Sequence, residues 1–133
     1  MTKANNTLDF ITAAGTGSTT YSGGGLSAPV AVAVDGAGYI WIANSTGNSV
    51  SEFSNAGVAK SGTAGYTGDS CTAAPCTIPA IGTGPSGIAI DNTGGVWVVS
   101  ATSSKVTHIL GVAAPVTTPT ATAVTNGTVG TKP

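Results

Sequence analysis

Charged side chains are scarce in this sequence. Only 7% of the 133 residues are Asp, Glu, Lys or Arg, against about 25% in an average soluble domain, and arginine does not occur at all. The net charge is −1, so the chain has no basic surface with which to neutralise phosphates. We therefore expect no nucleic-acid binding and no electrostatic attachment to a membrane surface.

Long hydrophobic runs are also missing. No apolar run approaches the roughly 18 residues that a membrane helix needs, so we expect no membrane insertion. The opening MTKANNTLDF is too polar for the core of a signal peptide.

Cysteine occurs twice, as Cys71 and Cys76 in DSCTAAPCT. This spacing favours a small disulfide-closed loop over two free thiols. Two cysteines and the distant His108, the single histidine, do not make a zinc site. A disulfide implies an oxidising compartment. We therefore expect an extracellular or periplasmic location, with the export signal and further sequence upstream of the residues given.

Glycine, serine and threonine carry the polarity that charged residues do not. Such a composition can indicate a disordered linker. Here 41% of the residues are hydrophobic, and valine and isoleucine occur in alternating runs. Alternation with many glycines predicts an all-β protein with tight turns.

An internal repeat organises the chain. Pro29–Gly57 aligns with Pro85–Ala113 without gaps. The identical pairs are Pro29/Pro85, Ala33/Ala89, Asp35/Asp91, Gly38/Gly94, Trp41/Trp97, Thr46/Thr102 and Val50/Val106. Because these positions include turn glycines and strand tryptophans, the match indicates a repeated structural unit.

Each copy predicts three antiparallel strands. They span 30–35, 39–44 and 49–54 in the first copy, and 86–91, 95–100 and 105–110 in the second. The strand 30–35 alternates valine and alanine, so both of its faces are apolar and we expect it to be buried on both sides. Asp35 and Asp91 begin the turns DGAG and DNTG, where a carboxylate can cap backbone N–H groups.

The N-terminal region repeats only the third strand, because Asn6–Gly15 aligns with Asn48–Gly57. Segments 18–22 and 58–67 are candidates for fourth, outer strands. Meanders of about four strands that recur at this period are typical of β-propeller blades. The sequence therefore predicts about two and a half four-stranded antiparallel blades in an incomplete ring. These are a partial blade over 1–28, a blade with the cysteine loop over 29–84, and a last blade with a C-terminal tail over 85–133.

The pattern P-x-x-x-A-x-D-x-x-G-x-x-W followed by N-S-V-x-x-F resembles the NHL-repeat propellers, in particular the virginiamycin B lyase-like branch. The resemblance covers residues 5–113. It implies a propeller fold and a metal-assisted elimination that uses His and Glu with magnesium. Lyase-like blades often carry Glu where this sequence has Asn44 and Ser100, which removes the acidic groups that such chemistry needs.

The remaining candidates for ligand contact are Trp41, Trp97, Asn44 and His108. The tryptophans could stack on a sugar, but at these strand positions they are more typical of a core between blades. His108 stands where Glu52 stands in the other copy, and the pattern favours an outward side chain over a general base. We expect no catalytic residue, metal or cofactor.

These observations predict a non-enzymatic exported propeller module that acts as a structural or protein- or ligand-binding scaffold. Its open blade faces would pair with a second copy or with the remaining blades of a longer parent chain. The alternative is the C-terminal part of a lyase-like or lactonase-like propeller enzyme with its active site in other blades.

Overall fold

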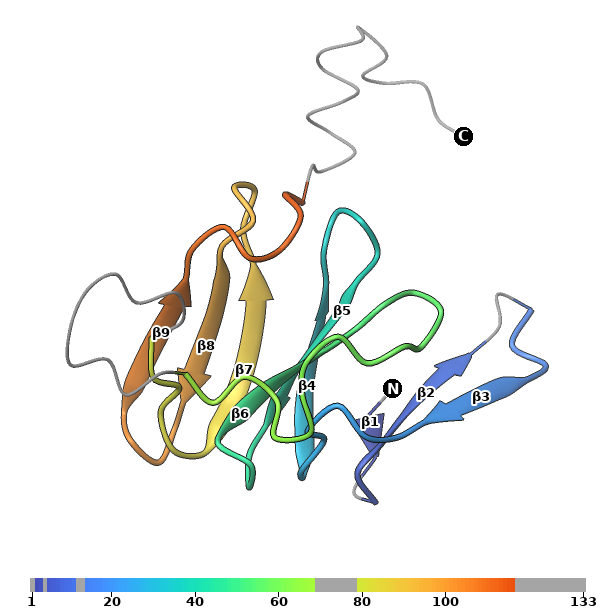
Figure 1. Ribbon diagram of the computed structural model, residues 1–133, viewed down its shortest axis with the longest axis horizontal. Helices are drawn as coiled ribbons and strands as arrows, with labels where there is room; N and C mark the ends of the chain where they lie inside the picture. The colour runs from blue at the N-terminus through green and yellow to red at the C-terminus, as the bar shows by residue number, and fades with distance from the viewer. Residues whose placement is uncertain (1, 4, 12–13, 69–78, 117–133) are drawn as a thin grey trace, which may run out of the picture.

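The computed structural model describes residues 2–3, 5–11, 14–68 and 79–116 (Figure 1). These residues form nine strands and no helix, so the predicted all-β class is confirmed. The strands are β1 (Thr2–Lys3), β2 (Thr7–Ile11), β3 (Ser18–Tyr21), β4 (Pro29–Val34), β5 (Ile40–Asn44), β6 (Ser49–Phe53), β7 (Pro85–Ile90), β8 (Val96–Ser100) and β9 (Lys105–Ile109). Cys71 and Cys76, the predicted disulfide, lie outside the described residues, as does the tail beyond residue 116. No helix in the described ranges is long and apolar enough to cross a membrane.

The strands form three antiparallel sheets of three strands each, and every strand pairs with its neighbour in the chain. The first sheet has the order β1-β2-β3, the middle sheet β4-β5-β6 and the last sheet β7-β8-β9. In Figure 1 they stand side by side with the middle sheet between the other two, and they do not close into a ring. The six long strands predicted for the two repeat copies all occur, with ends within one residue of expectation.

The two repeat copies share one strand register. In the middle sheet Pro29 pairs with Asn44 and Ala33 with Trp41. In the last sheet the equivalent pairs are Pro85 with Ser100 and Ala89 with Trp97. Each first strand carries an irregularity just after its proline. The repeat is therefore a structural repeat, down to its irregularities.

Four-stranded sheets do not occur in the described part of the chain. The predicted outer strand at 18–22 is present as β3, which pairs with β2. The one predicted at 58–67 is reduced to two isolated bridges, Val50 with Tyr66 and Phe53 with Ala59. The two glycines of this segment, Gly62 and Gly65, also form a turn, and they interrupt the pairing because glycine weakens a strand interior.

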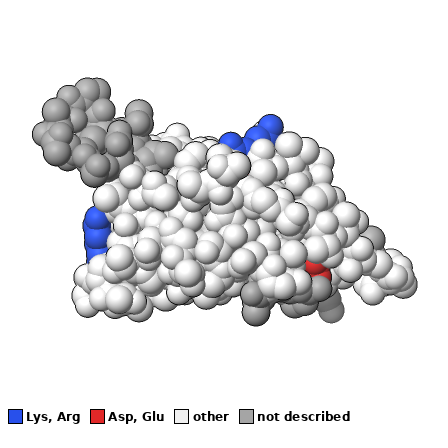
Figure 2. Space-filling view, turned by 60° about the horizontal axis from the view of Figure 1, so that its bottom comes forward, with Lys and Arg blue, Asp and Glu red and all other residues white. Residues whose placement is uncertain are grey.

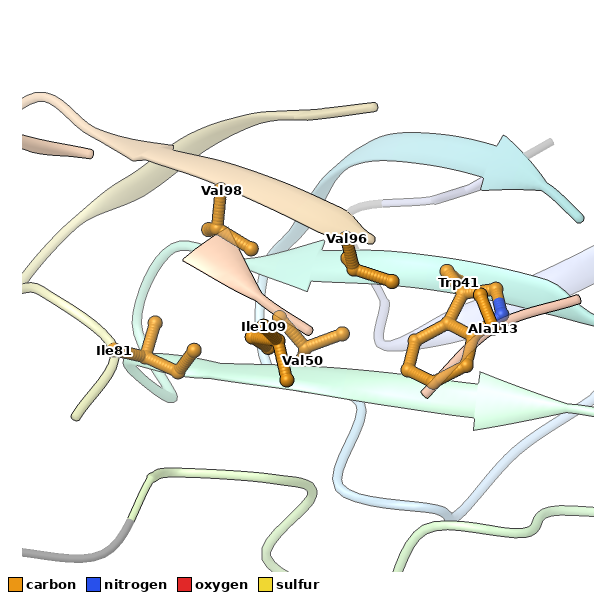
Figure 3. Close-up of a cluster of buried hydrophobic side chains, with 7 residues drawn as sticks. All are labelled: Trp41, Val50, Ile81, Val96, Val98, Ile109 and Ala113. Carbon is orange, nitrogen blue, oxygen red and sulfur yellow. The ribbon is translucent and has the colours of Figure 1, made fainter. Parts of the chain in front are cut away.

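The middle sheet is packed on both faces. One face contributes Ile40, Ile42 and Phe53 to a cluster with Leu8 of the first sheet. The other face packs against the last sheet in a second cluster, which contains Trp41, Val50, Ile81, Val96, Val98, Ile109 and Ala113 (Figure 3). Strands β5 and β6 of the middle sheet therefore alternate between two interfaces, as the period of two along a strand requires.

The prediction that strand 30–35 is buried on both sides is wrong. Val30, Val32 and Val34 are 49%, 45% and 55% exposed. Their face is the one that carries Ile40 and Ile42 on the neighbouring strand. The strand of the first sheet that lies against β4 is β1, which spans only Thr2–Lys3, so it cannot cover the length of β4.

Candidate functional site

The most regular polar feature of the molecule is an Asp–Trp pair that occurs once in each repeat copy. Oδ1 of Asp35 accepts the N–H groups of residues 37 and 39, and Oδ2 accepts the indole N–H of Trp41 at 3.3 Å. Oδ1 of Asp91 accepts the N–H groups of residues 93 and 95, and Oδ2 accepts the indole N–H of Trp97 at 2.9 Å. The predicted turn caps are confirmed. The hydrogen bond between this aspartate and the tryptophan was not predicted from the sequence. The spacing D-x-x-x-x-x-W recurs in both copies and could have indicated it.

The hydrogen bonds keep both carboxylates ionised. Burial alone would raise the pKa of Asp35. The donors around it, first the N–H of Ala114, outweigh that effect and bring the pKa below its ordinary value. The hydroxyl of Thr93, followed by the Trp97 indole and two backbone N–H groups, holds the pKa of Asp91 well below its usual range. Both carboxylates are thus engaged as acceptors, an arrangement suited to holding a tryptophan and a turn in place.

The two tryptophans occupy equivalent positions but different environments. Trp41 is 2% exposed because the last sheet covers it, so the prediction of a core tryptophan is confirmed there. The N–H of Ala114 also donates to Oδ2 of Asp35 at 3.0 Å, which ties the segment after β9 to the middle sheet. Trp97 is 40% exposed, and the same prediction is wrong for it, because no described sheet follows.

His108 lies directly across the strand pair from Trp97. The two rings stack with centroids 3.7 Å apart and planes 10° apart. Nε2 of His108 lies 3.4 Å from Oδ2 of Asp91 but makes no hydrogen bond within the described part of the chain. Val99 and Val106, a directly paired couple on the same face, are 47% and 59% exposed. We call Trp97, Val99, Val106 and His108 the open face of the last sheet.

A second recurring element links one sheet to the next. Asn6, Asn48 and Ser104 occupy the same turn in the three sheets, and all have left-handed φ values between 49° and 61°. Oδ1 of Asn6 accepts the N–H of Ala28 at 2.7 Å, and Oδ1 of Asn48 accepts the N–H of Gly84 at 2.9 Å. Ala28 and Gly84 are themselves equivalent in the repeat and immediately precede β4 and β7. Each asparagine therefore fastens the start of the following sheet.

Asn44, predicted as a possible ligand contact, is fully buried. Its Oδ1 accepts the N–H of Ser27, and its Nδ2 donates to the hydroxyls of Ser49 and Ser51 at 3.2 and 2.9 Å. The amide thus joins the chain before β4 to both β5 and β6. The structure brings Trp97 and His108 together on the open face, Trp41 lies in the interface behind them, and Asn44 is shielded from solvent.

Within the described ranges, no three His, Cys, Asp or Glu side chains come together in a group that could hold a metal ion. Neither the models of known protein families nor the curated proteins include a match to this chain.

Proposed function

We propose that the three sheets are successive blades of an incomplete β-propeller, and that the chain is a non-enzymatic interaction module. In this proposal the open face of the last sheet receives the outward face of the first sheet of a second copy, head to tail. The single observation that carries the proposal is that one repeated surface occurs twice in the chain, once covered by another sheet and once uncovered.

The arrangement of the sheets supports the assignment as blades. Each is a meander whose first strand lies nearest the first strand of its neighbour, since β4 contacts β7. The sheets stack face to face through apolar side chains, and the two repeat copies share one register. Radial stacking of such meanders around a common line of first strands is the propeller arrangement.

The covered surface shows what the uncovered one can accept. Trp41 and Val50 are 2% and 0% exposed beneath Val96, Val98 and Ile109. Their equivalents Trp97 and Val106 are 40% and 59% exposed. Burying apolar surface contributes about 25 cal/mol per Å², so a sheet that covers the open face as the last sheet covers the middle one would gain stability by the same packing.

The other end of the array offers a complementary surface. Ile11 on the outward face of the first sheet is 58% exposed, whereas its repeat equivalent Phe53 is fully buried in an interface.

The surface in Figure 2 is almost entirely free of charged side chains. With a net charge of −1, copies repel one another weakly. Head-to-tail contacts of this kind form closed rings or extended filaments.

The engagement of the carboxylates supports a binding role over catalysis. The carboxylate oxygens of Asp35 and Asp91 already accept hydrogen bonds from backbone and indole N–H groups. Export of the module stays a prediction that depends on the Cys71–Cys76 disulfide.

Sedimentation velocity over a range of protein concentrations tests the proposal. We expect species larger than the 12.7 kDa chain that grow with concentration. Trp97→Asp should shift the population toward the monomer, because it places a charge in the apolar contact. Val58→Asp is the matched control, since Val58 is 57% exposed outside the open face. A monomer at all concentrations, or equal effects of the two variants, would refute the proposal.

A further inference from the structure

A cavity of about 240 Å³ lies between the middle and last sheets, away from the open face. Its lining residues are Trp41, Glu52, Tyr66, Ile109 and Val112. Ile109 is buried, whereas Val112 is 38% exposed, so the cavity has an apolar floor and a rim that reaches solvent. Its volume is below the roughly 300–1,000 Å³ of pockets for drug-sized ligands, which limits it to a small molecule.

Two aromatic rings form one wall of the cavity. Trp41 and Tyr66 stack with centroids 6.1 Å apart and planes 29° apart. The indole N–H of Trp41 is held by Asp35. Tyr66 is held through its backbone, which exchanges two hydrogen bonds with Val50 at 2.9 and 2.7 Å. The Trp41 indole and the Tyr66 main chain are therefore held in place before any ligand arrives.

Glu52 supplies the one charge of the lining. Its Oε2 accepts the hydroxyl hydrogen of Tyr66 at 2.7 Å. Burial first, and then this carboxylate, raise the pKa of Tyr66 to about 12, so the tyrosine stays a neutral donor. Within the described ranges no cationic side chain pairs with Glu52. The nearest lysine in sequence, Lys60, places its Nζ 6.0 Å from the centroid of the Tyr39 ring.

A partly buried carboxylate without a cationic partner favours a positively charged ligand. The faces of Trp and Tyr attract cations through their quadrupoles, with Trp the strongest. An anion would be repelled by Glu52, and a neutral apolar molecule would leave the carboxylate without a counter-charge. A bare metal ion would find one carboxylate and no second acidic ligand in this lining.

We propose that this cavity binds a small organic ammonium ion, with Trp41 and Tyr66 against the cation and Glu52 as its counter-charge. The site is independent of the proposed assembly, because its residues lie in the interface within one chain. The described residues of the last sheet form no equivalent site, since His108 replaces Glu52 and stacks on Trp97.

The test compares choline with its neutral carbon isostere, the alcohol in which carbon replaces the quaternary nitrogen. A Trp97→Phe background leaves Trp41 as the single tryptophan, so fluorescence reports on this cavity. We expect choline to quench or shift the emission of Trp41 and to bind at least about tenfold more tightly than the alcohol, the order expected for a partly desolvated cation–π contact joined by a counter-charge.

Glu52→Gln keeps an acceptor for Tyr66 and removes the charge, so it should weaken choline binding about tenfold and leave binding of the alcohol unchanged. Asp91→Asn is the matched control, because it makes the same change in net charge on the opposite side of the last sheet, and it should not alter choline affinity. Circular dichroism of each variant verifies the fold. Equal affinities for choline and the alcohol, no binding of choline, or equal effects of the two carboxylate substitutions would each overturn the proposal.

Discussion

Asn48 offers the sharpest test of how one sheet is fastened to the next. Asn48→Ala removes the acceptor of the Gly84 N–H, a part-buried contact of 2.9 Å. Leaving such a donor unpaired costs about 1 kcal/mol or somewhat more. Alanine also pays about 1–2 kcal/mol for the left-handed φ of 49°. We expect the free energy of unfolding to fall by about 2–3 kcal/mol, a large part of the roughly 5–15 kcal/mol of a typical domain.

Two further variants separate these contributions. Asn48→Gly accepts the left-handed backbone, so it should cost only the hydrogen bond, about 1 kcal/mol. Ser104→Ala lies in the equivalent turn of the last sheet, where no described residue receives an inter-sheet bond, and it should change stability by less than about 0.5 kcal/mol. Urea denaturation followed by tryptophan fluorescence measures all three. If Asn48→Ala costs no more than Ser104→Ala, Asn48 does not link the sheets.

Three other predictions follow from the packing, the carboxylates and the cysteines. Ile109→Ala empties a position that is 1% exposed, so it should cost about 2–5 kcal/mol in the same assay; a loss below about 1 kcal/mol would contradict the described interface. The pKa of Asp35 is lower in the folded state, so its stabilisation is present above about pH 4 and is lost as the pH falls through the folded value. Asp35→Asn should flatten the acid-side decline of stability in urea titrations, and an unchanged decline would show that this carboxylate is not responsible. Intact mass measured without reductant should be lower by two hydrogen atoms if Cys71 and Cys76 form a disulfide, whose short loop contributes about 2 kcal/mol; alkylation of both thiols in the unreduced, denatured chain would exclude it.

Features set by local chemistry were predictable from the sequence. The strands around Trp41 and Trp97 follow from alternation, because side chains on a strand point to opposite faces. The roles of Asp35 and Asp91 follow from the turn that each begins, since a carboxylate there reaches the next backbone N–H groups without any distant partner.

Features that depend on a neighbouring sheet were not predictable. Val32 and Trp97 lie in apolar strands, yet both are exposed, because burial depends on what covers a face and not on the face itself. The position of Tyr66 beside β6 was not predictable for another reason. It pairs with β6 through a single bridge, and the glycine-rich segment around it has no alternation of apolar and polar residues that would predict a strand. Asn48 and Gly84 are separated by a long loop, so the alignment of the repeats does not predict that they are in contact.

The pairing of every strand with its neighbour in the chain has a kinetic consequence. Each sheet closes only short loops, which cost little conformational entropy, so local hairpins can form early and independently. The contacts between sheets form later, because they join residues from different sheets: Trp41 packs with Val96, and Asn48 accepts a hydrogen bond from Gly84. We therefore expect docking of preformed sheets to limit the folding rate. Until docking occurs, each sheet presents to other chains the apolar surface that it will later bury against its own neighbour.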